Sequence, residues 1–177
     1  MANDLQFLDL EVRHYGLTKA VASNYAEAAC VCLERHHDPT VEMTLEDNSN
    51  TTVVGATWQP LSSRAKVAWN NADDATRDGA YALAIAAIEK TRSLFAIGRA
   101  ETATGADYYV APAGDAPEDL ENSFRLEVSG IDKGPDSKIK QRLKQKLKQA
   151  ENGASDKPAI ACVVAFEALR ILTADLE

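Results

Sequence analysis

The hydrophobic pattern of the first 72 residues predicts a helix followed by a β-hairpin. Apolar side chains recur at helical spacing over residues 18–36, where Thr18 can cap the start of the helix. Residues 41–46 then alternate between apolar and polar, as in a strand with one face in solvent. A polar run predicts a turn before the returning strand at residues 51–58. A short helix is expected over about residues 62–70.

The second half of the chain is patterned more sharply. The predicted elements are a helix over residues 73–91, strands over 94–100, 107–110 and 124–129, a helix over 136–151 and a strand over 160–166. The two helices should pack on one sheet through Ile85 with Ile88 and Leu143 with Leu147. The tail, residues 167–176, is expected to end as a helix. The order helix–strand–strand–strand–helix–strand predicts an α+β fold with a mixed central sheet flanked by helices.

Length and composition are typical of one soluble globular domain. The chain has 177 residues, of which 45% are hydrophobic and 26% charged. We expect residues 73–177 to form the main core and residues 1–72 to elaborate the same domain. There is no apolar run of membrane-spanning length, no signal-peptide layout, and only three cysteines. These features predict a cytoplasmic protein with no membrane partner.

Charge is distributed unevenly along the chain. The formal net charge is −8, yet seven basic residues and a single acidic one lie between Lys133 and Lys148. Such a basic stripe can contact phosphates while an acidic remainder limits non-specific binding, which makes nucleic acid a candidate partner. The expected contact residues are Lys138, Lys140, Arg142, Lys144 and Lys148. The alternative interpretation is a helix face that is merely solvated.

Candidate chemistry centres on acidic residues. Glycine loops that cradle phosphates and nucleophile elbows do not occur in the sequence. Asp107 opens one predicted strand and Glu127 lies in the middle of the next. Carboxylates on neighbouring strands can converge on one Mg²⁺ ion, and Glu89 near the end of the preceding helix can support them. The alternatives are solvated strand-face acids, or a Glu127 that is paired with Arg125 or Arg99.

These residues and their order resemble the restriction-endonuclease-like PD-(D/E)XK superfamily over about residues 73–166. The resemblance implies a restriction-endonuclease-like core and a phosphodiesterase site that uses Mg²⁺ or Mn²⁺. It assigns Glu89 as the helix acid, Asp107 as the acid of the second strand, and Glu127 as the acid of the third. The family has a lysine two residues after the last acid, and this chain has Ser129 there. The resemblance therefore implies a cation from the next helix, Lys138 or Arg142.

Three functions are consistent with these patterns. The first is a metal-dependent nuclease or nuclease-like protein that processes nucleic acid, of the kind found in restriction or defence loci. The second is a nuclease-fold module without catalysis that binds nucleic acid, a protein partner or a second copy of itself. The third is an acidic interaction or inhibitor protein without enzymatic activity, since an acidic surface suits basic partners.

Overall fold

A computed structural model describes residues 3–102, 104–114, 120–153 and 155–176. The strands are β1 (Thr40–Asp47), β2 (Asn50–Thr57), β3 (Leu94–Arg99), β4 (Tyr108–Pro112), β5 (Phe124–Ile131), β6 (Ala159–Ala165) and β7 (Arg170–Asp175). They form one strongly curled sheet in the order β2-β1-β7-β6-β5-β4-β3. Pairing is parallel between β1 and β7 and between β5 and β6, and antiparallel elsewhere. The sheet is therefore mixed, as the sequence predicts.

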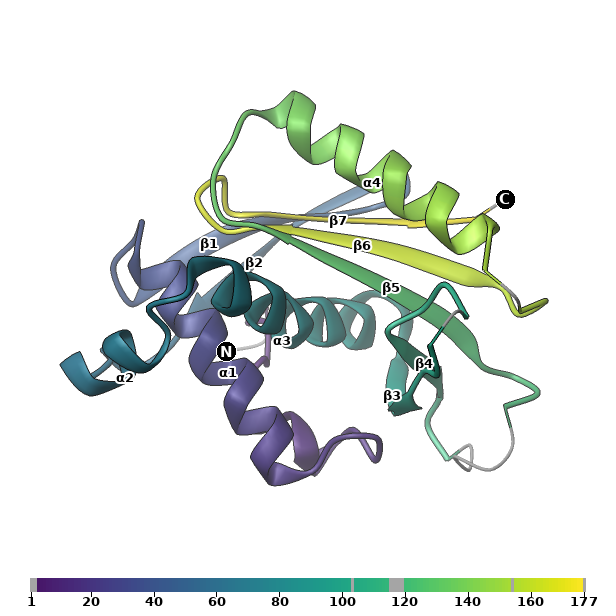
Figure 1. Ribbon diagram of the computed structural model, residues 1–177, viewed down its shortest axis with the longest axis horizontal. Helices are drawn as coiled ribbons and strands as arrows, with labels where there is room; N and C mark the ends of the chain where they lie inside the picture. The colour runs from purple at the N-terminus through teal and green to yellow at the C-terminus, as the bar shows by residue number, and fades with distance from the viewer. Residues whose placement is uncertain (1–2, 103, 115–119, 154, 177) are drawn as a thin grey trace.

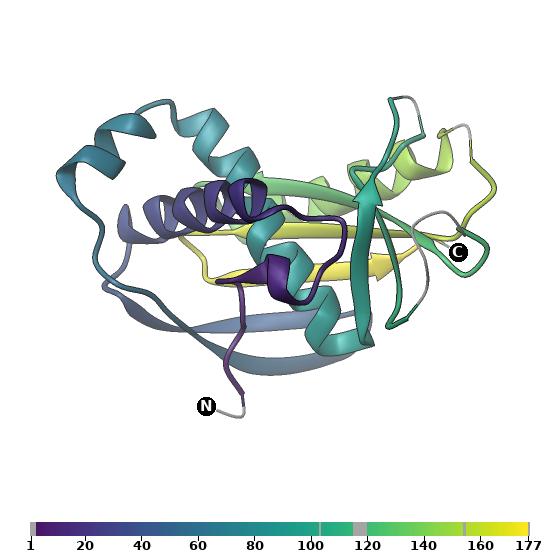
Figure 2. The ribbon, with the colours of Figure 1, turned by 90° about the horizontal axis from the view of Figure 1, so that it is seen from below.

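Helices cover both faces of this sheet. They are α1 (Lys19–Glu34), α2 (Ser63–Ala68), α3 (Ala72–Arg92) and α4 (Asp136–Glu151), with a 3-10 turn at Leu10–Val12. Figure 1 shows α1 and α3 on one face and α4 alone on the other, and Figure 2 shows α1 lying beside α3. No helix among the described residues is long and apolar enough to span a membrane.

The core has a large layer under α1 and α3 and a small one under α4. Ile85 and Ile88 are buried in the large layer, which confirms the expected packing of that helix. In the small layer Ile139 and the partly buried Leu143 pack against residues of β5, β6 and β7. Every residue of β6 is buried, because helices cover this strand on both faces.

The order of elements predicted for residues 73–166 is the order observed. The prediction for the tail is wrong, because residues 170–175 form β7 instead of a helix. This strand lies between β6 and β1 and pairs with both. Hydrogen bonds to two neighbouring strands outweigh the local helical pattern. A short sequence window contains no information about these partners.

The N-terminal hairpin and the second half of the chain share this one sheet. The parallel pairing of Thr44–Asp47 with Arg170–Thr173 joins them.

Helix α3 approaches β5 closely at Gly130, where an added Cβ atom would lie 2.3 Å from the carbonyl oxygen of Thr76. A glycine at this position brings the first half of α3 against the strand that carries Glu127.

Candidate active site

A notch in the sheet begins where β4 stops pairing with β5. The ladder between these strands contains three residue pairs and ends at Tyr108 opposite Leu126. Beyond this point β5 continues to Ile131 with β6 as its partner. The next amide of β5, that of Val128, therefore has no strand carbonyl on this side. It donates instead to Oδ2 of Asp107 at 2.8 Å.

Asp107 is held at both of its carboxylate oxygens. Oδ1 accepts a hydrogen bond from the Tyr81 hydroxyl at 2.7 Å, while Oδ2 accepts from the Val128 amide. The guanidinium of Arg99 lies 3.8 Å from Oδ1. Burial, followed by the nearby charge of Asp107, raises the pKa of Tyr81, so its phenol remains a hydrogen-bond donor at neutral pH. Asp107 thus keeps a defined orientation at the edge of the notch.

Glu127 lies on the face of β5 that α4 covers, and its side chain is 4% exposed. Its Oε1 accepts a hydrogen bond from Nζ of Lys146 at 2.6 Å, and the same ammonium donates to Gln149 at 3.1 Å. Burial raises the pKa of Glu127, the hydrogen bond from Lys146 opposes this, and the charge of Asp107 adds to it. Asp107 and Glu127 both line the same cleft.

The cation beside Glu127 is thus neither of the two arginines considered from the sequence. Arg99 lies beside Asp107 instead. Arg125 donates to the backbone carbonyls of Lys157, Thr104 and Ala150. It is buried and joins the loops at Thr104 and Lys157 to the C-terminal end of α4.

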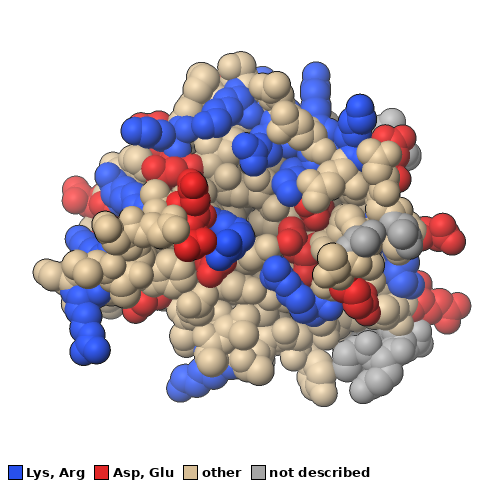
Figure 3. Space-filling view, viewed as in Figure 1, with Lys and Arg blue, Asp and Glu red and all other residues tan. Residues whose placement is uncertain are grey.

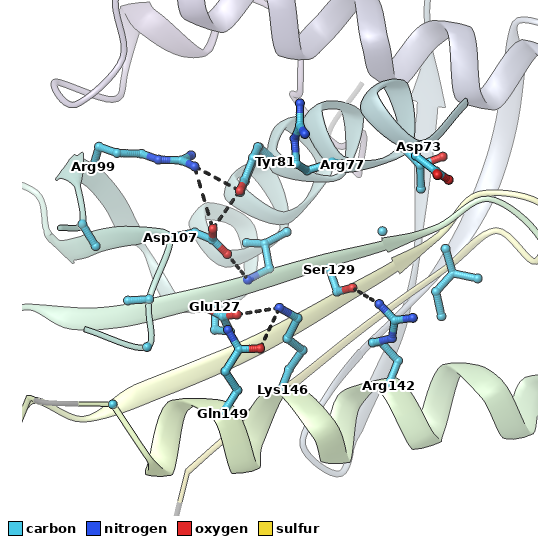
Figure 4. A pocket seen from close by; sticks show the side chains of 18 of the residues that line it. Asp73, Arg77, Tyr81, Arg99, Asp107, Glu127, Ser129, Arg142, Lys146 and Gln149 are labelled. Carbon is cyan, nitrogen blue, oxygen red and sulfur yellow. Dashed lines mark hydrogen bonds and ion pairs between the residues drawn. The ribbon is translucent and has the colours of Figure 1, made fainter. Parts of the chain in front are cut away.

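These side chains line a cleft of about 1230 Å³ between the first half of α3 and α4. Tyr81 and Arg99 lie on one side of it and Lys146 with Arg142 on the other, with both carboxylates between them (Figure 4). Figure 3 shows basic side chains gathered over α4 at the top of the view. The cleft therefore combines two acids with cations from two directions.

The basic residues of α4 divide into two stripes. Lys138, Arg142 and Lys146 are four residues apart and all line the cleft. Lys140, Lys144 and Lys148 are exposed and do not line it. Two residues turn a helix by about 200°, so the two stripes face different directions. The structure therefore separates the five contact residues proposed from the sequence, placing only Lys138 and Arg142 at the cleft.

Glu89 does not reach the cleft, so the structure does not place it with the other two acids. It accepts hydrogen bonds from Nε of Arg13 at 2.7 Å and from the ring of His14 at 3.0 Å. Glu89 lies eight residues beyond Tyr81, about 12 Å further along the helix axis. In this position it ties the N-terminal segment to α3.

Lys138 lines the cleft but forms no described ion pair with Asp107 or Glu127, so the cation next to Glu127 is not the one that the family resemblance suggests. Its ammonium donates to the carbonyl oxygen of Lys133 at 3.3 Å. Lys146, which the sequence analysis did not select, is the residue that reaches Glu127. Ser129, in the family's lysine position, accepts a hydrogen bond from Arg142 at 3.1 Å.

The register between β5 and α4, which only the packed structure fixes, explains this difference. Because α4 runs back along β5, two residues of strand, about 6.6 Å, correspond to four residues of helix, about 6 Å. Ser129 faces Arg142, so Glu127, two residues earlier, faces Lys146, four residues later. Counting back along the strand and forward along the helix leads from one pair to the other.

The donor set fits Mg²⁺ in a minimal way. Asp107 and Glu127 supply hard oxygen ligands, and Mg²⁺ is commonly held by one or two carboxylates with waters and substrate phosphates. No group of three or more His, Cys, Asp or Glu side chains suited to a metal occurs among the described residues. Most of the coordination would therefore come from water and substrate.

Comparison with known proteins adds no family to this description. The chain matches no family model, and no curated protein or solved structure is significantly similar to it.

Proposed function

We propose that this protein is a Mg²⁺-dependent nuclease that binds nucleic acid in the cleft between α3 and α4. The observation that carries the proposal is the grouping of Asp107, Glu127 and Lys146 at the notch between β4 and β5. Two acids and one ammonium are the groups that phosphodiester hydrolysis needs: ligands for a metal ion and a positive charge beside it. In this proposal Lys146 supplies the positive charge that the family's lysine would supply and that Ser129, in the lysine's position, does not.

Five residues that line the cleft each have a defined role in this proposal. Asp107 and Glu127 would hold the metal ion, which when bound supplies a Lewis acid and activates water. The ammonium of Lys146, at 2.6 Å from Glu127, is placed to orient a water molecule and to stabilise developing negative charge. Lys138 and Arg142 lie further along the same stripe and would bind phosphates of the substrate.

The topology around the site supports a restriction-endonuclease-like core. Between α3 and β6 the element order agrees with the one that the family resemblance implies. The strands β3, β4 and β5 are antiparallel neighbours, and α4 connects β5 to the parallel strand β6. The two acids stand where the second and third strands of this core part. Fold analogy alone does not establish function, so the proposal rests on the side chains.

Cleavage of labelled oligonucleotides tests the proposal. Single-stranded and duplex DNA and RNA are incubated with the protein and Mg²⁺ or Mn²⁺. We expect metal-dependent cleavage that Asp107→Asn or Glu127→Gln lowers at least about 10³-fold, because each removes a metal ligand and preserves shape. Glu89→Gln is the matched control, since it neutralises an acid outside the cleft. Equal activity of all four proteins would contradict the assignment of the site.

A second candidate, a binding module without catalysis, is favoured by Ser129 and by the salt bridge that already occupies Glu127. It predicts oligonucleotide binding without cleavage in either metal. Ser129→Lys then decides between a decayed site and a pure binding module, because it restores the family's lysine. Gain of cleavage identifies a decayed nuclease, and continued inactivity identifies a binding module. Absence of binding even at low salt would instead favour the acidic interaction protein.

A further inference from the structure

A cluster of three tyrosines lies behind Asp107, and one of them, Tyr81, donates a hydrogen bond to its carboxylate. The rings of Tyr25, Tyr81 and Tyr108 have centroids 5.0–6.4 Å apart, and all three are buried. The guanidinium of Arg99 lies 4.6 Å from the centre of the Tyr81 ring and 4.9 Å from that of Tyr108. This cluster joins α1, α3, β3 and β4 directly behind the notch.

The hydrogen bonds that involve Arg99 or Asp107 have a fixed direction, because a guanidinium only donates and a carboxylate only accepts. Its Nη2 donates to the Tyr81 oxygen at 3.1 Å, so the Tyr81 proton is directed to Oδ1 of Asp107 at 2.7 Å. Tyr25 accepts from Nη1 at 3.2 Å and shares a hydrogen bond of 2.7 Å with Tyr108, in which either hydroxyl can be the donor. Tyr81 is thus the tyrosine of the three whose hydroxyl contacts an acid of the cleft.

We infer that Tyr81 is a positioning residue that orients Asp107 for metal binding. With Tyr81 on Oδ1 and the Val128 amide on Oδ2, each oxygen has one lone pair left, and the carboxylate cannot turn without losing a hydrogen bond. Partners behind a metal ligand commonly change metal affinity by about 10-fold or more. The inference rests on the proposed function, because it needs Asp107 to be a metal ligand.

The test compares Tyr81→Phe with Tyr25→Phe. Both remove one hydroxyl from the same aromatic cluster, and only the first removes the contact with Asp107. Mn²⁺ affinity is measured by calorimetry on the full chain, with thermal unfolding recorded for each variant. We expect Tyr81→Phe to weaken Mn²⁺ binding about tenfold and Tyr25→Phe to leave it within about twofold. In addition, Mg²⁺ should change the tyrosine absorbance of the wild type and of Tyr25→Phe, but not of Tyr81→Phe.

The outcomes are separable. Equal Mn²⁺ affinity in all three proteins overturns the role of Tyr81 and leaves the proposed function intact. A similar loss in both variants, accompanied by a similar loss of thermal stability, shows a merely structural role and also overturns it. A wild-type protein that binds no Mn²⁺ overturns the proposed metal site and this inference together.

Discussion

Two acidic clusters of this protein have similar chemistry and different surroundings. In the cleft, Glu127 accepts a hydrogen bond from Lys146 at 2.6 Å. In the second half of α3, outside the cleft, Glu89 accepts a hydrogen bond from Arg13 at 2.7 Å. The first pair opens on a cavity of about 1230 Å³ with a second carboxylate, Asp107, beside it. The second is completed by His14, whose ring is fully buried.

The difference shows that an acid with a cation beside it does not by itself mark a functional site. Glu89 joins the N-terminal segment to α3 and does not line the cleft. Asp107 and Glu127 both line it. We therefore expect changes in the cleft to affect chemistry and binding, and changes at Glu89 to affect stability.

Of the variants that compare these two clusters, the largest effect is expected at Lys146. Lys146→Met should lower metal-dependent cleavage by about 10²–10³-fold, because it removes the charge beside Glu127. Adding Ser129→Lys to the same chain should recover at least tenfold, since residue 129 lies on the same strand face two positions away. Lys144→Met, on the outward stripe, serves as the control. Cleavage that survives Lys146→Met would show that the α4 lysine has no catalytic part.

The next effect separates the two stripes of α4. Lys138→Glu with Arg142→Glu should weaken oligonucleotide binding more than tenfold at low salt and reduce the steepness of its salt dependence by about two phosphate contacts. Lys140→Glu with Lys144→Glu changes the net charge equally and should cost less than about threefold. Fluorescence anisotropy against salt concentration measures both. Equal losses in the two double variants would mean that binding depends on overall charge and not on the cleft.

A smaller effect is expected at the other cluster. Glu89→Gln should lower the free energy of unfolding by about 1–3 kcal/mol, because the neutral amide has one acceptor oxygen and can accept from only one of Arg13 and His14. Cleavage should stay within about twofold of wild type. Urea unfolding and the cleavage assay measure the two properties separately. A large loss of cleavage in a stably folded variant would return Glu89 to the site.

The smallest effect is a pH dependence at His14. Burial lowers the pKa of His14, against the opposing hydrogen bond and charge of Glu89. Nδ1 of His14 also accepts from the Ala96 amide, a bond that the protonated ring cannot make. The unfolded chain therefore takes up this proton more readily than the native state, and stability falls as the pH decreases through about 6.5. Unfolding free energies at about pH 7.5 and 5.5 should differ less in His14→Asn than in wild type.

Local patterns predicted most of the elements because each is recorded within a short window. The alternation at residues 41–46 and the apolar stripe with Ile85 and Ile88 correspond to a strand and a helix in the structure. The prediction of a helix for the tail was wrong because β7 depends on two partner strands. One is β6, which precedes it directly in the chain, and the other is β1, which lies more than a hundred residues earlier. Similarly, the sequence does not distinguish Glu89 from an acid of the cleft, because its partner Arg13 lies 76 residues earlier in the chain.

The sequence by itself determined the alternation of helices and strands, the acids at or next to neighbouring strands and the basic composition of α4, since periodicity and charge are local properties. Tertiary structure alone decided which basic residue meets which acid. The point at which β4 stops pairing with β5 sets the position of Asp107. Helix α4 runs back along β5, which brings Lys146 to Glu127 and Arg142 to Ser129. Such contacts depend on strand register and helix rotation, which arise only when distant segments pack together.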